Sequence, residues 1–355
     1  MDKFGLDGHK LGYHVSRLSD WLDGKNTYPV YMEISPTGAC NHRCSFCGLD
    51  FMKYQARSLD IQIIKERITE LGGLGLKSVM YGGEGEPLLY KNIAELAAHT
   101  KASGIDASIT TNGVLLKSGL AEKILGELEW IKVSLNAGDR ETYSIIHKTK
   151  MEDFDQVVEN MATAKKIKDA NGYPTALGMQ MVLLPENRSG VDNLAKIARD
   201  IGMDYLVVKP FSQHPMSGIK TYASVGYEES ARLAEEMEKY NTSEFCVVVR
   251  VNAMRKHDTS GKGYNRCLAL PFWSYIDAGG NIWGCSVYLS DERFLYGNIY
   301  ERSFKEIWEG EKRRSSLEWV ENEMDASRCR INCRMDSINS YLTNLKSPPA
   351  HANFI

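Results

Sequence analysis

The chain has 355 residues, a formal net charge of −3 at pH 7 and a pI near 6.3. A chain of this length buries roughly 75% of its unfolded surface, so it can hold a core without disulfides. The charge gives no overall basic surface for nucleic acid, and no apolar run suits a membrane span or a signal peptide. We therefore expect a cytoplasmic protein with one large and one small domain, and neither nucleic acid nor a membrane as a partner.

Short β-branched or aromatic runs alternate with longer helical patterns as far as residue 210, which is typical of β/α units around a parallel sheet. The predicted strands are 30–35, 78–82, 107–111, 130–136, 177–184 and 205–210. The predicted helices are 61–71, 93–102, 154–168 and 194–200. These elements predict an α/β fold, a partial (β/α)6 TIM-like barrel, in which chemistry gathers at the carboxyl ends of the strands.

Beyond residue 210 this alternation stops. We predict a charged helix at 228–240, an apolar strand at 245–251 and a hairpin with a Gly-Gly-Asn turn at 273–285. A small C-terminal auxiliary domain is therefore expected after the barrel. The expected parts are an N-terminal extension (1–28), the barrel (29–215), a connecting helix (216–242), the auxiliary domain (243–345) and a tail (346–355).

Three cysteines follow the first predicted strand with the spacing C-x3-C-x2-C, at Cys40, Cys44 and Cys47. In a reducing compartment, thiolates favour zinc, Cu(I) or iron–sulfur over disulfides. A structural zinc site needs a fourth closed ligand, and His42, the local candidate, lies in a short loop with little room to reach the same metal. Three thiolates would instead hold a cluster that keeps one iron open for a ligand from outside the protein.

The second predicted strand ends in the string Gly82-Gly83-Glu84-Gly85-Glu86-Pro87. Its glycines permit close approach of the backbone, but two carboxylates would repel phosphate and no Walker lysine follows. Glutamates at an exposed strand end suit a cation such as an ammonium group. Glu84 and Glu86 share one face of the strand, so the sequence does not choose between them. Solvated glutamates in a glycine turn are the alternative.

Polar side chains end the later predicted strands. Hydroxyl and amide groups there can hydrogen-bond ribose hydroxyls or a carboxylate, or serve as turn and capping residues. A lysine there can contact a polar substrate or a carboxylate, or extend to solvent. The residues are Thr111, Asn112, Ser134, Asn136, Gln180 and Lys209.

Four cysteines in the last third of the chain, Cys267, Cys285, Cys329 and Cys333, form a second constellation. Four thiolates can complete the ligand set of a [4Fe–4S] cluster or of an all-cysteine zinc site, and the cysteines alone do not distinguish the two.

A further cysteine, Cys246, lies among apolar residues on a predicted strand, which favours a buried and inert thiol. His214, Arg266 and Tyr275 flank the candidate ligands or the last barrel strand. They are candidates to face a substrate, with ordinary core or surface roles as the alternative.

The three-cysteine spacing, with an aromatic residue before the third cysteine and a Gly-Gly-Glu string after the second strand, resembles the signature of the radical S-adenosylmethionine (SAM) superfamily. The resemblance implies that Cys40, Cys44 and Cys47 hold a [4Fe–4S] cluster whose open iron is chelated by the amino and carboxylate groups of SAM. It further implies SAM contacts from Phe46, Gly83, Glu84 or Glu86, Thr111, Asn112, Ser134, Asn136 and Gln180.

The C-x12-G-x4-C spacing from Cys267 to Cys285, the hairpin and the SFKEIW helix resemble the auxiliary domains called SPASM and twitch. A full SPASM domain uses more cysteines for two clusters. The resemblance therefore implies one auxiliary [4Fe–4S] cluster, of the twitch type, with Cys267, Cys285, Cys329 and Cys333 as ligands.

The radical SAM resemblance implies that an electron from a flavodoxin- or ferredoxin-type donor cleaves SAM to a 5′-deoxyadenosyl radical, which abstracts a substrate hydrogen. One auxiliary cluster implies an electron acceptor. Our leading hypothesis is an oxidoreductase that oxidises a secondary alcohol of a small sugar-like or aminocyclitol substrate, with Lys209 and His214 as candidate substrate contacts.

Three alternatives stay open. The first is redox-neutral epimerisation of a sugar, with Cys246 as the hydrogen-atom donor, or dehydration. The second is modification of a ribosomal peptide, for which the short segment before the barrel offers no recognition domain. The third is a zinc-binding structural or adaptor protein.

Overall fold

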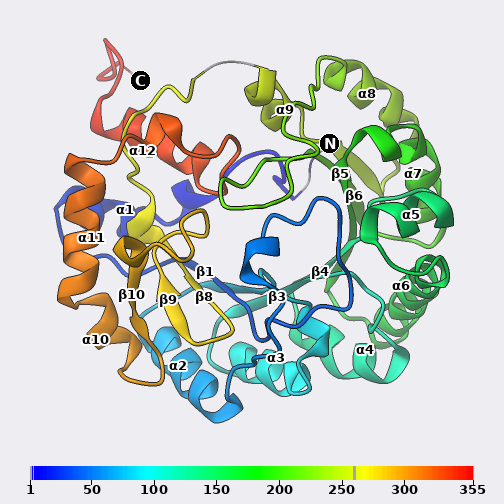
Figure 1. The fold of residues 1–355 in the computed structure, drawn as a ribbon, viewed down its shortest axis with the longest axis horizontal. Coiled ribbons are helices and arrows are strands. Elements are labelled where there is room, and N and C mark those ends of the chain that lie inside the picture. Colours follow the sequence, from blue (N-terminus) through cyan, green and yellow to red (C-terminus); the bar gives the residue numbers. More distant parts are fainter. Residues whose placement is uncertain (1, 3, 259–260, 355) are drawn as a thin grey trace.

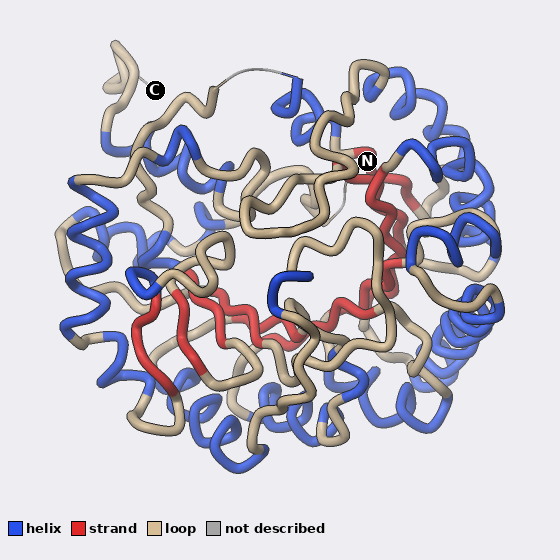
Figure 2. The backbone as a smooth tube through the Cα atoms, viewed as in Figure 1, coloured by secondary structure: helices blue, strands red, loops and turns tan. Residues whose placement is uncertain are grey.

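The computed structural model describes residue 2, residues 4–258 and residues 261–354. Its centre is a ten-stranded sheet in the order β10-β9-β8-β1-β2-β3-β4-β5-β6-β7. Figure 1 shows the sheet as a curve with helices along its outer side. Figure 2 shows that loops fill much of the inner, concave side.

The barrel portion has six strands that pair in parallel in chain order. They are β1 (Tyr31–Ile34), β2 (Ser78–Tyr81), β3 (Asp106–Thr111), β4 (Trp130–Ser134), β5 (Ala176–Leu183) and β6 (Tyr205–Pro210). The helices between them are α2 (Ile61–Gly73), α3 (Ile93–Ala102), α4 (Ser118–Ile124), α5 (Arg140–His147), α6 (Glu152–Asn171) and α7 (Val191–Asp200). Each predicted strand lies within two residues of its observed bounds, so the predicted barrel is confirmed; α4 and α5 were not predicted.

The sheet continues beyond both edges of this barrel portion. β7 (Cys246–Val249) pairs in parallel with β6, and β8 (Trp273–Ile276) pairs in parallel with β1. β9 (Asn281–Trp283) and β10 (Leu295–Asn298) add antiparallel strands, which confirms the predicted hairpin. The strand expected to open the auxiliary domain therefore joins the barrel sheet. The sequence could not show this, because its pairing partner is set by tertiary structure.

The remaining helices cover the ends of the sheet. They are α1 (Val15–Leu22), α8 (Ser230–Met237), α9 (Val251–Asp258), α10 (Phe304–Trp308), α11 (Glu311–Asn322) and α12 (Asp336–Lys346). Leu11 and Leu18 of the N-terminal extension share a core with Trp273 and Leu342 of the C-terminal region. None of the helices in the described part of the chain combines the length and the apolar character that a membrane span requires.

Strand alternation separates an apolar outer face from a polar inner face. On β4, Ile131 and Val133 are fully buried in the main core with the helices, whereas the alternate residues Lys132 and Ser134 keep some exposure. Successive side chains point to opposite faces of a strand. Polar residues on these strands therefore gather inside the curve, at the carboxyl ends where barrel chemistry takes place.

Candidate active site

The loop after β1 carries Cys40, Cys44 and Cys47 and lies inside the curve of the sheet (Figure 1). Nη1 of Arg43 donates to the carbonyl of Cys40 at 2.7 Å, and the guanidinium lies 4.2 Å from the centroid of the Tyr54 ring. The backbone N–H of Cys47 donates to the carbonyl of Cys44 at 3.1 Å. These contacts close the loop and hold the three cysteines together.

The electrostatics of this loop fit a metal centre. Burial raises the pKa of all three thiols, to about 11 for Cys40. For Cys44, the charges of Cys47 and Cys40 raise the pKa further. Three thiolates this close are unfavourable without a nearby positive charge. A bound cluster supplies that charge, so the donor set fits a [4Fe–4S] cluster with three protein ligands.

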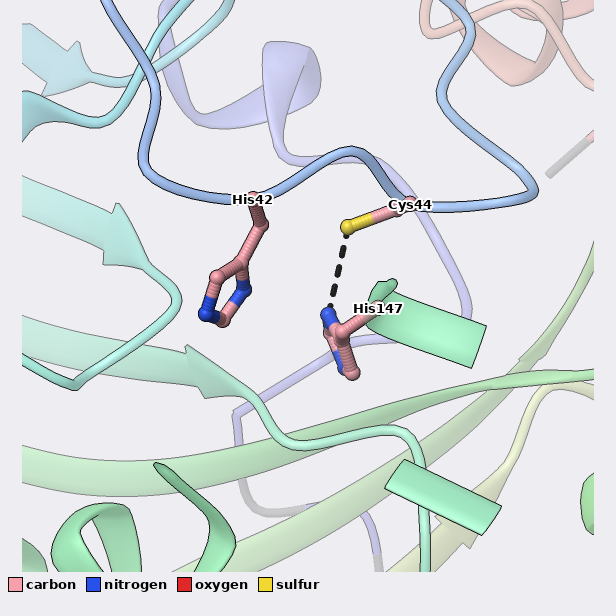
Figure 3. A group of neighbouring side chains, drawn as sticks. All are labelled: His42, Cys44 and His147. Carbon is pink, nitrogen blue, oxygen red and sulfur yellow. Dashed lines mark hydrogen bonds between the residues drawn. The ribbon is translucent and has the colours of Figure 1, made fainter. Parts of the chain in front are cut away.

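A second donor group lies at the same loop and consists of His42, Cys44 and His147 (Figure 3). Nδ1 of His147 lies 3.2 Å from Sγ of Cys44, and one ligand atom from each residue lies within 4.8 Å of the others. A zinc ion here would use one cysteine and two histidines and leave the other two cysteines outside. The sequence indicated His42 as the only candidate histidine ligand, because His147 belongs to α5 and lies about a hundred residues further along the chain.

The carboxylate of Glu86 is buried and partnered by protein groups. It accepts from the Thr111 hydroxyl, from the backbone N–H of Asn112 at 2.8 Å and from that of Leu88 at 3.1 Å. Burial raises the pKa of Glu86, and these donors lower it. Glu86 also acts electrostatically on the Cys40 thiol. Glu86 therefore ties the ends of β2 and β3 together beside the cysteine loop.

Glu84 lies in the loop after β2, and its carboxylate faces the segment after β8. Its carboxylate pairs with Arg57 at 3.1 Å and accepts from the backbone N–H of Ala278 at 2.7 Å. Gly83 before it has a φ of +102°, and a Cβ there would lie 2.4 Å from the Tyr275 hydroxyl, so only glycine fits. Both glutamates thus have partners, and the assignment of the SAM amine to either one stays a prediction.

Two of the predicted polar residues face the cysteine loop from the end of β3. Nδ2 of Asn112 donates to Oδ1 of Asn41, inside the cysteine motif, at 2.7 Å. The Thr111 hydroxyl donates to Glu86 and accepts from the backbone N–H of Gly113 at 2.9 Å. These bonds position the cysteine loop over the end of the third strand.

The residues that end β4 and β5 divide into two kinds. Nε2 of Gln180 donates to Oγ of Ser134 at 3.2 Å on the inner face, so both remain near the predicted SAM position. Asn136 is fully buried in a left-handed conformation with a φ of 56°. Its Oδ1 accepts from the backbone N–H of Val182 at 2.7 Å, and its Nδ2 donates to the Ser134 carbonyl at 3.1 Å. Asn136 therefore shapes the strand end, and its predicted contact with SAM gains no support from this placement.

Phe46 is half-buried and packs against an apolar cluster that includes Ile146 and Val182. Its ring meets the ring of His147 edge-on, with centroids 5.8 Å apart. Phe46, itself part of the cysteine loop, thus packs toward the end of β5, and its predicted contact with adenine stays a prediction.

The four C-terminal cysteines line one cavity near the β9 hairpin and α12. Burial is the main cause that raises the pKa of Cys333, to about 12, and that of Cys285, and neighbouring thiols raise both further. Donors also approach the sulfurs. The Tyr288 hydroxyl lies 3.3 Å from Sγ of Cys329, and Nδ2 of Asn339 lies 3.6 Å from Sγ of Cys267. This enclosed four-thiol set fits a cluster with four protein ligands.

Cys246 lies outside this cavity. It is the first residue of β7 and is buried with Tyr205 and Val207 at the amino ends of the strands. Four residues, or roughly 13 Å along a strand, separate it from Arg250 beyond the carboxyl end. This position supports the buried-thiol interpretation and gives no support to Cys246 as a hydrogen donor at the barrel mouth.

His214 bridges the two cysteine regions. Its Nε2 lies 3.2 Å from the carbonyl of Ser286, next to Cys285, and its ring stacks on Phe51 with centroids 4.9 Å apart. Its Nδ1 accepts from the backbone N–H of Met216 at 3.2 Å. Both ring nitrogens are therefore occupied, which favours a positioning role over the predicted contact with substrate.

The other two candidates hold the fold together. Nη1 of Arg266 donates to the carbonyl of Met324 at 2.7 Å near the end of α11. The Tyr275 hydroxyl lies 2.5 Å from Oγ of Ser35 and accepts from the backbone N–H of Glu84 at 3.1 Å. Neither is placed toward a substrate by these contacts.

Lys209 lies near the carboxyl end of β6, as predicted, among basic residues that the sequence analysis missed. The signal for Lys132 was present, because it alternates with the apolar residues of β4. The others come from segments whose inner position is set only by tertiary structure. The missed residues are Lys132, Arg250, Arg330 and Arg334.

Two family models match the chain. The radical SAM superfamily model matches residues 34–198, and the SPASM model, described as an iron–sulfur cluster-binding domain, matches residues 267–334. The first match contains the three-cysteine loop and the second contains all four cavity cysteines. The chain therefore contains a radical SAM domain and, C-terminal to it, a SPASM domain. The two matches confirm the predicted cofactors, SAM and iron–sulfur clusters, whereas the assignment of individual cysteines as ligands stays a prediction.

Curated relatives match the radical SAM part. The GTP 3′,8-cyclase of Chlorobaculum tepidum is 30% identical over 189 residues, which is 52% of this chain and 55% of that protein. A probable GTP 3′,8-cyclase of Saccharolobus solfataricus is 30% identical over 213 residues, 59% of this chain and 64% of that protein. The match thus spans more than half but less than two thirds of the length of these two relatives.

Solved structures share the fold. The SAM-bound crystal structure of Streptococcus suis SuiB has a TM-score of 0.64 at 18% identity and covers 95% of this chain and 79% of SuiB. The structure titled native anSMEcpe with bound AdoMet has a TM-score of 0.60 at 17% identity, covering 82% and 84%. These likenesses confirm the predicted barrel with its C-terminal domain.

Proposed function

We propose that this radical SAM enzyme oxidises a small molecule held inside the barrel, and that the SPASM cysteine site accepts an electron from the substrate radical. When bound, the first cluster and SAM supply a 5′-deoxyadenosyl radical, and the auxiliary cluster supplies an electron acceptor. A secondary alcohol would lose a hydrogen atom to that radical, its hydroxyl proton to water, and one electron to the auxiliary cluster, to give a ketone.

The observation that carries this proposal is the docking of the auxiliary cysteine segment onto the barrel mouth. Arg330, next to Cys329, donates to the hydroxyl and the carbonyl of Ser212, both at 2.7 Å, just beyond β6. Arg334, next to Cys333, pairs with Glu33 of β1. The four-thiol site is therefore attached to both sides of the mouth into which the three-cysteine loop projects.

The protein's own residues position and enclose the reacting molecules. His214 and Phe51 join the two cysteine regions, and Glu86 fixes the loop after β2 to the end of β3. Such contacts keep the mouth rigid and limit the access of water and other quenchers to a radical.

The substrate class of the leading sequence-based hypothesis has no support from the relatives. They are named for GTP, and one fold neighbour was solved with a precursor peptide. A second candidate function is therefore a radical cyclisation of a nucleotide. The inner-face lysines Lys132 and Lys209 favour it over peptide modification, because they suit a small anion.

The test is the mass of the product formed in deuterated water by the reconstituted enzyme with SAM and dithionite. Oxidation gives a product lighter than its substrate by two hydrogens. An isomer that carries one carbon-bound deuterium would instead show epimerisation. An isomer with a new ring, one carbon-bound hydrogen fewer and no carbon-bound deuterium would show cyclisation, because the abstracted hydrogen is replaced by a ring bond and the added proton is held by nitrogen. Either isomer overturns the oxidation proposal. The absence of 5′-deoxyadenosine under these conditions would overturn the radical mechanism itself.

A further inference from the structure

The inner face of the barrel carries a basic cluster. Lys132 lies on β4 between Ile131 and Val133, whose side chains belong to the outer core, and Lys209 lies on β6 beyond the outer-core residue Val208. Three arginines join the two lysines, one beyond β7 and two beside the auxiliary cysteines. The basic cluster consists of Lys132, Lys209, Arg250, Arg330 and Arg334.

Protein carboxylates neutralise only part of this charge. Arg334 pairs with Glu33, and Arg250 lies 3.4 Å from the carboxylate of Asp7. Arg330 lies near the thiols of Cys333 and Cys285, so the two lysines are the members of the cluster that no anionic side chain pairs with in the described part of the chain. In the described part of the chain, neither lysine of the cluster has an ion pair with a carboxylate. The Lys132 ammonium lies 5.1 Å from the centroid of the Trp130 ring, and the Lys209 side chain makes no hydrogen bond to a described residue.

The two lysines are enclosed but not sealed. Both keep partial solvent exposure although β4 and β6 are each paired with a strand on both sides. Burial, and then the charges of Arg334 and Arg250, lower the pKa of Lys132 to about 8. Burial and the charge of Lys132 lower the pKa of Lys209 well below its usual value. Enclosed like charges without partners are costly, so an anion that enters this space is bound favourably.

The depth of Lys132 indicates which anion this is. In the register of the sheet, Lys132 pairs with Thr110 and Gly178, two residues below the Ser134 and Gln180 rim where SAM is expected. Lys209 pairs with Val182, two residues above Gln180, so an anion that contacts both lysines must span these two depths. The SAM carboxylate carries one charge and belongs to that rim. A phosphate ester carries about 1.5 to 2 negative charges and three acceptor oxygens. A diphosphate carries more charge and is longer, so it suits two lysines at different depths better than a single carboxylate does.

We propose that Lys132 and Lys209 bind a phosphate or diphosphate group of the substrate inside the barrel. This inference rests on the proposed function in that the group belongs to the molecule whose hydrogen is abstracted. Nε and Nη2 of Arg330 already donate to Ser212, so the two lysines are the proposed contacts of this group.

The test is isothermal titration of the reconstituted protein with inorganic pyrophosphate, and separately with SAM. In Lys132→Met and Lys209→Met, pyrophosphate should bind roughly tenfold or more weakly than in the wild type, because each loses a charge-assisted contact. SAM affinity should stay unchanged. Lys312→Met, on the exposed side of α11, is the matched control and should bind both ligands like the wild type.

Thermal unfolding gives a second measurement. If the two lysines had only a structural role, replacing them would not change the effect of pyrophosphate on the melting temperature. Pyrophosphate should raise the melting temperature of the wild type and of Lys312→Met, but not of the Lys132→Met and Lys209→Met double variant. Without anion, the double variant should be at least as stable as the wild type, because an enclosed unpaired charge has been removed. Iron content and far-UV circular dichroism verify that each variant is folded.

Three results would overturn the proposal. The first is that the wild type does not bind pyrophosphate. The second is that malonate, used as a dicarboxylate probe, binds more tightly than pyrophosphate. The third is a loss of SAM affinity with pyrophosphate binding retained, which would assign the lysines to the SAM carboxylate. These measurements require no turnover, so their failure is distinct from a failure of the oxidation proposal.

Discussion

The two cysteine sites are built in different ways. The three-cysteine loop is one short segment closed by local contacts such as that of Arg43, and it projects into the barrel mouth. The auxiliary cysteines come from three separate segments and line one cavity. The first site leaves a coordination position for a molecule from outside, whereas the second can satisfy its metal with protein ligands alone. Reactivity is thus expected at the first and electron transfer at the second.

The largest expected effect is on the three-cysteine site. Replacing Cys40, Cys44 and Cys47 together by Ala should remove about four irons per chain and abolish 5′-deoxyadenosine formation with dithionite. The auxiliary iron should remain, because its ligands lie in a separate cavity. Iron analysis and chromatography of the nucleoside check this, and SAM cleavage that persists in the variant would contradict it.

The second effect concerns the auxiliary site. Cys329→Ala with Cys333→Ala should remove the second set of about four irons. SAM cleavage should persist in part, and product formation should stop, because the substrate radical then has no electron acceptor. Quantifying 5′-deoxyadenosine and product in the same reaction tests the division of roles. If product continues to form, the electron acceptor lies elsewhere.

The third prediction compares the two glutamates beside the first site. Glu86 acts on the Cys40 thiol, so Glu86→Gln should weaken SAM binding roughly tenfold or more through loss of a charge-assisted contact. Glu84→Gln breaks the pair with Arg57 and should chiefly lower the free energy of unfolding, by about 1 to 3 kcal/mol. SAM titration and denaturant unfolding separate the two outcomes. Equal SAM affinity in both variants and the wild type would exclude both residues.

The smallest effect is expected at Cys246. Cys246→Ala should retain the full iron content and SAM cleavage, and should lower the free energy of unfolding by about 1 kcal/mol, since a small buried side chain is lost. Iron analysis is the decisive measurement. Iron at the level of a single-cluster protein would show that Cys246 is a ligand after all.

The barrel strands and the first cysteine site were predictable because their signals are local. Strand alternation, glycine turns and a motif within eight residues do not depend on distant partners. The pairing of β8 with β1, the partners of Glu84 and the approach of His147 to Cys44 were not predictable. Each of these contacts joins segments that are distant in the chain, and no local sequence pattern predicts a contact of this kind.

Cys246 and His214 illustrate the same limit within the candidate site. Their residue types suit radical and proton chemistry, and both lie close in sequence to candidate features. Their roles depend on which end of a strand a residue occupies and on whether its polar atoms are already used. These are properties of the packed barrel, which places Cys246 at the amino ends and occupies both nitrogens of His214.

The parallel pairing of β8 with β1 has a consequence for how the protein can be shortened. A chain cut before residue 261 would leave β1 with an open row of backbone N–H and C=O groups, a template for edge-to-edge aggregation. The truncated barrel should accumulate as insoluble material even though its own catalytic motif is intact. Point substitutions, not domain deletion, are therefore the way to separate the two halves of this protein.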